Sequence, residues 1–202
     1  MRSNNFDRIA FLYDRLARTV FGKSIIDAQK HFLKLIPNHA TVLILGGGSG
    51  WILRELLQER PGVKVCYIDA SKEMITLAKK ETQGRSVLFI HGTENDIPKQ
   101  KFDIVLTHFY LDLFSTDSLR TVIAKIKASL FANGRWIVTD FRDDSWWQSL
   151  MLKGMYIFFR LTCRIESRRL PDWSKALKEA GGSKSDRKFF YGRFIETALF
   201  QY

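Results

Sequence analysis

The stretch Val42 to Trp51, VLILGGGSGW, constrains the fold more than any other part of the chain. A run of apolar residues ends abruptly at a cluster of glycines, and helix-forming residues follow from Ile52 to Arg60. This order predicts a strand, a tight glycine turn and a helix. Glycines let the backbone turn sharply and approach a ligand closely, while the start of the helix offers unpaired N–H groups to a negative group. We therefore expect this turn to bind a nucleotide-like ligand.

The glycines follow the spacing GxGxG, at Gly46, Gly48 and Gly50. The dinucleotide fingerprint GxGxxG requires a third glycine at position 51, where this chain has Trp51. The indole side chain disfavours a nicotinamide-dependent oxidoreductase, which stays open as an alternative. An incidental glycine-rich turn in another α/β protein is a second alternative.

Strand and helix signals alternate regularly after residue 40. The predicted strands are 41–46, 63–69, 86–90, 102–107 and 135–141. The helical segments between them are 50–60, 71–82, a short one near 93–96, and 117–130. Apolar strands joined by helices predict a parallel sheet that is covered on both faces.

The two flanks of this alternating region have different patterns. Amphipathic helices are predicted over 6–18 and 24–36, the second capped near Ser24 and Asp27. A long helical region, 145–169, precedes the segments 185–191 and 194–202, which meet at Gly192 as a hairpin. We expect residues 1–202 to form one domain in three parts: an N-terminal helical cap (1–40), a cofactor-binding core (41–140), and a long helix with a closing hairpin (141–202).

Composition narrows the class of protein. A chain of 202 residues with 46% hydrophobic content can bury a core of ordinary size. The N-terminus lacks the apolar region of a secretory signal, and no apolar run reaches the roughly 18 residues of a membrane span, so we expect a cytoplasmic protein. Cys66 and Cys163 are too few for a disulfide framework or a zinc site, and we expect no metal.

The net charge of +11 lies mainly outside the central region, because residues 41–140 hold 13 basic and 11 acidic side chains. A basic excess attracts nucleic acid, anionic membrane surfaces or acidic substrates. A solvated basic surface without a partner is equally compatible with this composition.

A carboxylate, Asp69, ends the strand VKVCYID about 20 residues after the glycine turn. An acid in this place can accept hydrogen bonds from ribose hydroxyls. Together, the GxGxG turn and the segment YIDASKEM resemble the first two motifs of class I S-adenosylmethionine-dependent methyltransferases, in particular the branch with the quinone-biosynthesis enzymes. The resemblance is specific over roughly residues 40–140. It implies a Rossmann-like, doubly wound α/β fold with a mostly parallel seven-stranded sheet, an antiparallel last strand, and helices on both faces.

The resemblance also implies S-adenosylmethionine as cofactor and assigns its contacts. The methionine end would lie on the glycine turn, the ribose on Asp69, the adenine among four side chains, and the methyl-facing end near the close of the fourth strand. These cofactor-binding positions are Gly46, Gly47, Gly48, Gly50, Asp69, Ala70, Met74, Thr93, Glu94 and Thr107, with Tyr13 as a lid residue. For Met74 and Tyr13, ordinary packing is the alternative, and for Asp69 a simple helix-capping role.

The chain departs from the family pattern in two places. Many members carry an acid two residues before the first glycine, where this chain has Ile44, and often an acid after the third-strand glycine, where it has Thr93. Glu94 or the backbone would then have to bind the adenine amine. Losing a charge-assisted hydrogen bond without replacement costs on the order of 1.5–3 kcal/mol. These departures affect the expected affinity more than the expected fold.

The segment THFYLDLF follows the fourth strand, and in the resembling family this position faces the methyl group and the substrate. His108 is the first candidate for a general base, because an unperturbed histidine has a pKa of roughly 6.5. A purely structural role for His108 is the alternative. Tyr110 is the second candidate, and Asp112 a weaker one that could simply begin the next helix. Methyl transfer from a sulfonium depends mainly on alignment, so neither a catalytic triad nor a metal is required.

The region 145–169 is rich in aromatic and aliphatic residues, with Lys153, Arg160 and Arg164 at helical spacing. Such wide apolar coverage predicts packing on the sheet, a wall of an apolar substrate pocket, or docking at a membrane interface. Together with the resemblance, it favours a small apolar or aromatic acceptor, quinone-like or lipid-like, and it leaves a peripheral membrane contact open. Nucleic acid is not favoured, because the tetrapeptide THFY at 107–110 differs from the NPPY type of base methyltransferases.

These observations predict an S-adenosylmethionine-dependent methyltransferase. A decayed module that binds S-adenosylmethionine or S-adenosylhomocysteine without turnover is one alternative, prompted by Ile44 and Thr93. A nicotinamide-dependent oxidoreductase is the other.

Overall fold

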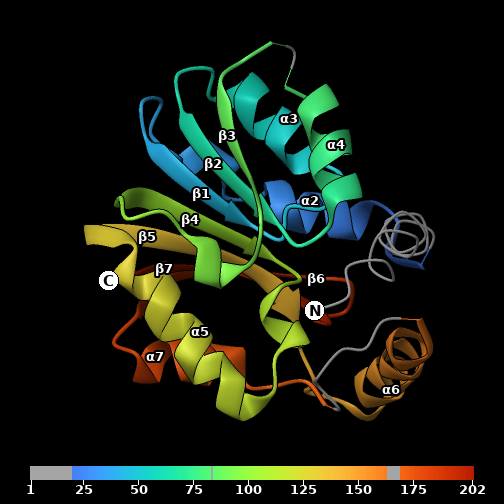
Figure 1. The fold of residues 1–202 in the computed structure, drawn as a ribbon. Coiled ribbons are helices and arrows are strands. Elements are labelled where there is room, and N and C mark those ends of the chain that lie inside the picture. Colours follow the sequence, from blue (N-terminus) through green and yellow to red (C-terminus); the bar gives the residue numbers. More distant parts are fainter. Residues whose placement is uncertain (1–19, 83, 163–168) are drawn as a thin grey trace.

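The computed structural model describes residues 20–82, 84–162 and 169–202, and a single seven-stranded sheet organises them (Figure 1). The strands lie in the order β3-β2-β1-β4-β5-β7-β6. Their bounds are β1 Thr41–Leu45, β2 Lys64–Asp69, β3 Val87–His91, β4 Phe102–His108, β5 Leu130–Phe141, β6 Ser183–Phe190 and β7 Ile195–Gln201. The first five strands pair in parallel, whereas β7 runs antiparallel to both β5 and β6. The predicted fold class, with its antiparallel last strand, is confirmed.

Helices cover both faces of the sheet. In Figure 1, α3 and α4 lie on one face, while α5 and α7 lie on the other. Among the described residues the helices are α2 Lys23–Lys30, α3 Trp51–Glu59, α4 Lys72–Lys80, α5 Thr116–Ala128, α6 Trp146–Thr162 and α7 Trp173–Glu179, with short 3₁₀ turns η1 Leu33–Leu35, η2 Glu94–Asp96 and η3 Leu111–Leu113.

Alternation along β1 explains the two layers of core. Val42 and Ile44 face the cluster that includes α3 and α4, and Leu43 and Leu45 face the cluster that includes α5 and α7. All four side chains are at most 1% exposed, as expected for a central parallel strand buried on both faces. Because Ile44 is part of this core, an acid at this position would have to be buried.

The helix predicted over 24–36 is shorter than expected. α2 begins after Gly22, whose positive φ of 54° sets the start without a side-chain cap, so Ser24 and Asp27 are not the N-cap. The chain then forms η1 instead of a continuous helix. In contrast, α4 has a side-chain cap, because the Ser71 hydroxyl accepts a hydrogen bond from the backbone N–H of Met74 at 3.2 Å.

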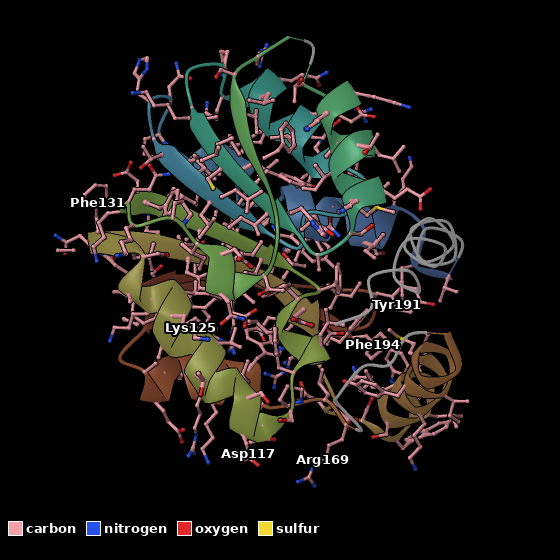
Figure 2. The ribbon with its side chains drawn as sticks, viewed as in Figure 1. Asp117, Lys125, Phe131, Arg169, Tyr191 and Phe194 are labelled. Carbon is pink, nitrogen blue, oxygen red and sulfur yellow. The ribbon has the colours of Figure 1, made fainter. Side chains whose placement is uncertain are left out.

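A third apolar cluster lies at the carboxyl ends of the strands. It joins Phe21, Phe141, Tyr156 and Phe194, with Trp147 and Tyr191 packed against it. Figure 1 shows α6 at this end of the sheet, and Figure 2 shows Tyr191 and Phe194, from the β6–β7 connection, beside it. Within the described segments, no helix combines the length and the hydrophobicity needed to cross a bilayer.

Candidate functional site

The glycine turn connects β1 to α3, and each glycine has a separate structural reason. Gly46, Gly48 and Gly50 have φ values of 64°, 63° and 86°, a backbone region that side chains disfavour. A Cβ on Gly50 would lie 2.5 Å from the Cα of Ala78, so this glycine lets α4 approach the start of α3. A Cβ on Gly47 would lie 2.3 Å from the Tyr67 ring. Around Gly48, by contrast, no atom lies within 4 Å of that position, so its open side is available to a ligand.

Asp69 lies next to this turn. One carboxylate oxygen accepts the backbone N–H of Gly48 at 2.9 Å, and the other accepts the N–H of Ser71 at 2.9 Å. The residue is 9% exposed. The parallel pairing of β1 with β2 brings the ends of both strands to the same edge of the sheet. The glycine turn and Asp69, the residue predicted to bind the ribose, therefore form one continuous polar surface.

Sequence reasoning did not identify Tyr67 as a functional residue. Its hydroxyl donates to the backbone oxygen of Gly48 at 2.8 Å, and its ring packs under Gly47. Tyr67 is fully buried within β2, where an aromatic residue is typical of strand packing. The sequence signal available was its position two residues before Asp69, on the same face of the strand.

The four positions assigned to adenine lie around Asp69, with different exposures. The backbone N–H of Gly92 donates to the Asp69 carbonyl at 2.9 Å, which fixes the loop after β3 beside the loop after β2. Ala70 is exposed, whereas Met74 is 1% exposed. Thr93 caps η2: its hydroxyl accepts from Asn95, and its N–H donates to Asp96 at 2.8 Å. The Thr93 hydroxyl is therefore engaged within its own turn.

Tyr110 and Glu94 form a bridge over the glycine turn. The Tyr110 hydroxyl donates to the Glu94 carboxylate at 3.0 Å, and a Cβ on Gly46 would lie 2.5 Å from the Tyr110 ring. Because β3 and β4 flank β2 and β1 in the sheet, this hydrogen bond crosses the ends of both central strands. Burial, and then the charge of Glu94, raises the pKa of Tyr110 well above its usual value, which keeps the phenol protonated as a donor.

His108 ends β4 and is 9% exposed. Burial lowers the pKa of its imidazole to about 3, and neither ring nitrogen has a hydrogen-bond partner among the described residues. The ring is thus neutral at pH 7, and a base with so low a pKa has little tendency to hold a proton. The neighbouring Thr107 is 1% exposed, and its hydroxyl accepts from the Trp136 indole at 2.8 Å.

Two buried carboxyl groups lie near the same strand ends. Asp140 accepts backbone N–H groups of Leu111, Asp112 and Phe141 at 3.1, 3.2 and 2.8 Å. Burial raises the pKa of Asp112 to about 7 and that of Asp140 well above its usual value, and the charge of Asp112 raises that of Asp140 further. Asp140 gave no signal in the sequence, because its role depends on the pairing of β5 with β4.

The structure thus brings the predicted site residues to one edge of the sheet, from the glycine turn through Asp69 and Glu94 to Tyr110. Tyr13 lies outside the described residues, as do the helix predicted over 6–18 and Cys163. The roles of the individual residues toward a ligand stay predictions.

Comparisons with known proteins agree with this geometry. Residues 42–134 match a family model described as a methyltransferase domain. The chain is 24% identical over 155 residues to malonyl-[acyl-carrier protein] O-methyltransferase of Halalkalibacterium halodurans, which covers 71% of this chain and 56% of that protein. It is 29% identical over 139 residues to demethylmenaquinone methyltransferase of Thermotoga maritima, and the aligned region covers 67% of this chain and 59% of that protein. The chain therefore spans little more than half the length of these curated relatives.

The fold also resembles solved structures. One is the 1,6-didemethyltoxoflavin-N1-methyltransferase of Burkholderia thailandensis, which was solved with 1,6-didemethyltoxoflavin and S-adenosylhomocysteine. The two share 17% identity with a TM-score of 0.70, over 98% of this chain and 87% of that one. The predicted resemblance to class I methyltransferases, with similarity to the quinone branch, is confirmed.

Proposed function

We propose that this chain, which carries a methyltransferase domain of the class I type, transfers a methyl group from S-adenosylmethionine to a small-molecule acceptor. The observation that carries the proposal is the hydrogen bond between Asp69 and the Gly48 backbone, which unites the glycine turn and the acid at one edge of the sheet. The relatives named above and the neighbour solved with S-adenosylhomocysteine support the same cofactor.

The residues present fit an adenosyl group with a methionine tail. The open side of Gly48 leaves room for the tail, and the start of α3 presents backbone N–H groups toward its carboxylate. The Asp69 carboxylate is an acceptor for ribose hydroxyls, with Ala70, Met74, Thr93 and Glu94 as the surroundings of the adenine. Because Ile44 is buried and the Thr93 hydroxyl is engaged in a cap, the tail ammonium and the adenine amine need other partners. For the adenine amine, that partner is Glu94 or the backbone.

S-adenosylmethionine supplies a methyl group on a positively charged sulfur that is already activated as a leaving group. The chain's own task is to align that methyl with the acceptor and to exclude water. The Tyr110–Glu94 bridge, with Tyr110 against Gly46, closes one side of the turn.

We further propose an apolar or aromatic acceptor of quinone-like or lipid-like character. The support is the aromatic cluster at the strand ends, where the ring centroids of Phe109 and Phe141 lie 4.7 Å apart and those of Trp147 and Phe194 lie 5.6 Å apart. Phe109 directly follows β4 and Phe141 is the last residue of β5, which places these two rings at the strand ends to which the methyl group is assigned. A relative named for demethylmenaquinone supports this class of acceptor.

We also propose that the outer face of α6 contacts an anionic membrane. Trp146, Leu150 and Ile157 are 80%, 63% and 59% exposed, and they share one face of the helix with the exposed Lys153. An apolar stripe with a cationic residue, on a chain with a net charge of +11, complements an anionic lipid surface. The cytoplasmic location predicted from the sequence stays a prediction.

Calorimetry and a transfer assay test the proposed function. The protein is titrated with S-adenosylmethionine, S-adenosylhomocysteine and NADH, and then incubated with S-adenosylmethionine labelled in its methyl group and a panel of hydroquinones, phenols and fatty acids. We expect binding of both adenosyl compounds, no binding of NADH, and label in an apolar product. Binding of NADH alone would favour an oxidoreductase, and binding without transfer to any acceptor would favour a decayed binding module.

A further inference from the structure

Asp112 is a buried carboxyl group with an unsatisfied oxygen. The residue is 5% exposed, and its Oδ1 is buried without a hydrogen-bond partner among the described residues. Buried polar atoms are nearly always paired, and an unpaired one costs about 1–3 kcal/mol, more when it is charged. An acid retained in such a position therefore calls for a functional explanation.

The backbone around Asp112 is held firmly. Its N–H and that of Leu111 donate to Asp140 at the end of β5, and its carbonyl accepts the hydroxyl of Tyr156, from α6, at 3.3 Å. Asp140 has three backbone donors for its two oxygens, whereas the Asp112 Oδ1 has none. The pair is thus asymmetric: Asp140 fixes the loop, and Asp112 keeps a free acceptor oxygen.

The position of Asp112 connects the two parts of the proposed site. Asp112 lies two residues after Tyr110 in the sequence, and the Tyr110 ring covers Gly46 of the glycine turn. Through Tyr156 it also contacts α6, beside the aromatic cluster of Phe109 and Phe141. The short segment that carries Asp112 is therefore linked to the glycine turn through Tyr110 and to α6 through Tyr156.

We propose that the free oxygen of Asp112 receives the proton of a neutral hydroxyl group on the methyl acceptor. This inference rests on the proposed methyltransferase function. In the step, the acceptor oxygen forms a bond to the methyl carbon while the bond between that carbon and the sulfonium sulfur breaks, with its electron pair going to sulfur. The hydroxyl proton goes to the Asp112 carboxylate. The products are a methyl ether, neutral S-adenosylhomocysteine and a protonated Asp112, so atoms and charge balance.

The electrostatics of the site favour Asp112 over His108 for this role. A general base works best when its pKa lies near the working pH, and that of Asp112 is about 7, whereas that of His108 is about 3. Among the residues that the structure describes, the titratable groups placed against Asp112 are Asp140 from β5 and Tyr156 from α6. Neither of these two groups is a cation that would hold the Asp112 carboxylate permanently ionised.

The same arrangement predicts which acceptors depend on Asp112. Neither a carboxylate nor a thiolate has a proton to give at neutral pH, so neither acceptor needs a base. The structure therefore assigns Asp112 to phenolic or enolic hydroxyl groups.

Asp112→Asn tests the proposal, with Asp117→Asn as a matched control because Asp117 is an exposed acid on α5 (Figure 2). Methyl transfer is measured with hydroquinone, with thiophenol at a pH where it is a thiolate, and with benzoate. Calorimetry with S-adenosylhomocysteine and thermal unfolding report on each variant's site and fold. We expect Asp112→Asn to lower kcat/KM for hydroquinone by about 10²–10⁴-fold, the usual range for a lost general base. Transfer to thiophenol and binding of S-adenosylhomocysteine should not change, and any transfer to benzoate should be equal in the variant and the wild type.

The control should match the wild type throughout, and the wild-type rate with hydroquinone should rise with pH around 7. Equal losses with hydroquinone and thiophenol would show a structural role for Asp112 and overturn the proposal. It would also be overturned by an unchanged hydroquinone rate in Asp112→Asn, or by a wild type that binds S-adenosylhomocysteine but does not methylate hydroquinone. A wild type that does not bind S-adenosylhomocysteine would instead refute the proposed function.

Discussion

Asp69 has two roles: its carboxylate at the end of β2 holds the glycine turn, and the same carboxylate is the proposed acceptor for the ribose. Its two oxygens bind Gly48 and the start of α4, so the groups that shape the turn are the ones that would meet the ribose. A ligand hydroxyl would share an acceptor that the fold already orients. This combination makes Asp69 the most informative single position in the proposed cofactor site.

Asp69→Ala should weaken binding of S-adenosylhomocysteine by about 10–100-fold, because hydrogen bonds to a charged group contribute about 1.5–3 kcal/mol. Calorimetry measures the change. Asp103→Ala is a useful comparison, since that carboxylate binds Thr41 at the opposite end of β1 and should affect stability alone. Equal affinity in the Asp69→Ala variant and the wild type would disprove the ribose assignment.

The raised pKa of Asp112 has a consequence for stability. The unfolded chain releases this proton near the ordinary pKa of 3.8, whereas the folded chain keeps it until about 7. Between these values the folded state binds more protons, so this group makes the free energy of unfolding fall as pH rises, by at most about 1.4 kcal/mol per pH unit. Its contribution is fully present below pH 4 and is lost by pH 7.

Asp112→Asn should remove this slope. Chemical denaturation of the wild type and the variant at several pH values from 4 to 8 gives the difference directly, with Asp117→Asn again as the control. We expect the wild type to lose stability relative to the variant as pH increases. A constant difference across this range would contradict the raised pKa.

At the scale of elements, α6 combines a buried and an exposed apolar face. Leu152 and Tyr156 pack into the cluster at the strand ends, while Trp146, Leu150 and Ile157 point away from it. The sequence predicted wide apolar coverage of this helix, with Lys153 among three basic residues at helical spacing. In the structure, Lys153 shares the exposed face with these apolar residues. Packing against the sheet accounts for the apolar residues on the inner face only, because the apolar side chains on the outer face stay exposed.

Trp146→Ser should reduce binding to vesicles of phosphatidylcholine with phosphatidylglycerol, because an indole that is 80% exposed is a strong interfacial anchor. Co-sedimentation measures the bound fraction. Phe131→Ser is the matched control, since Phe131 is 47% exposed at the opposite end of the sheet from α6 (Figure 2). Binding that is equal for both variants and the wild type, or absent for all three, would remove the proposed membrane contact.

At the scale of the whole molecule, the sequence predicted what depends on local pattern. The positions of the strands and the glycine turn followed from runs of apolar residues and from Gly46, Gly48 and Gly50, although β5 begins at Leu130 and not at residue 135. The resemblance supplied the mostly parallel seven-stranded sheet with its antiparallel last strand, which no local pattern contains. That residues 1–202 form one domain stays a prediction.

The remaining features of the site depend on pairing between distant strands. Tyr67 reads as an ordinary strand residue until β2 lies beside β1, and Asp140 gains its role only because β5 pairs with β4 and presents it to η3. The bridge from Tyr110 to Glu94 similarly needs the order β3-β2-β1-β4. Local sequence patterns cannot predict such contacts, because the residues are far apart in the sequence and meet only when the strands pair.

Ligand binding should stabilise the whole molecule, because the proposed site joins β1, β2, β3 and β4 and exists only in the folded state. A ligand at 100 times its Kd adds about 2.7 kcal/mol to the free energy of unfolding. For a chain of this size, each kcal/mol shifts the Tm by about 2–4 °C. S-adenosylhomocysteine at that excess should therefore raise the Tm by about 5–11 °C in thermal unfolding. NADH should leave the Tm unchanged, and Asp69→Ala should lose most of the shift at the same ligand concentration. A Tm that rises equally with both compounds would indicate nonspecific binding to the basic surface and would leave the strand-end site without its proposed ligand.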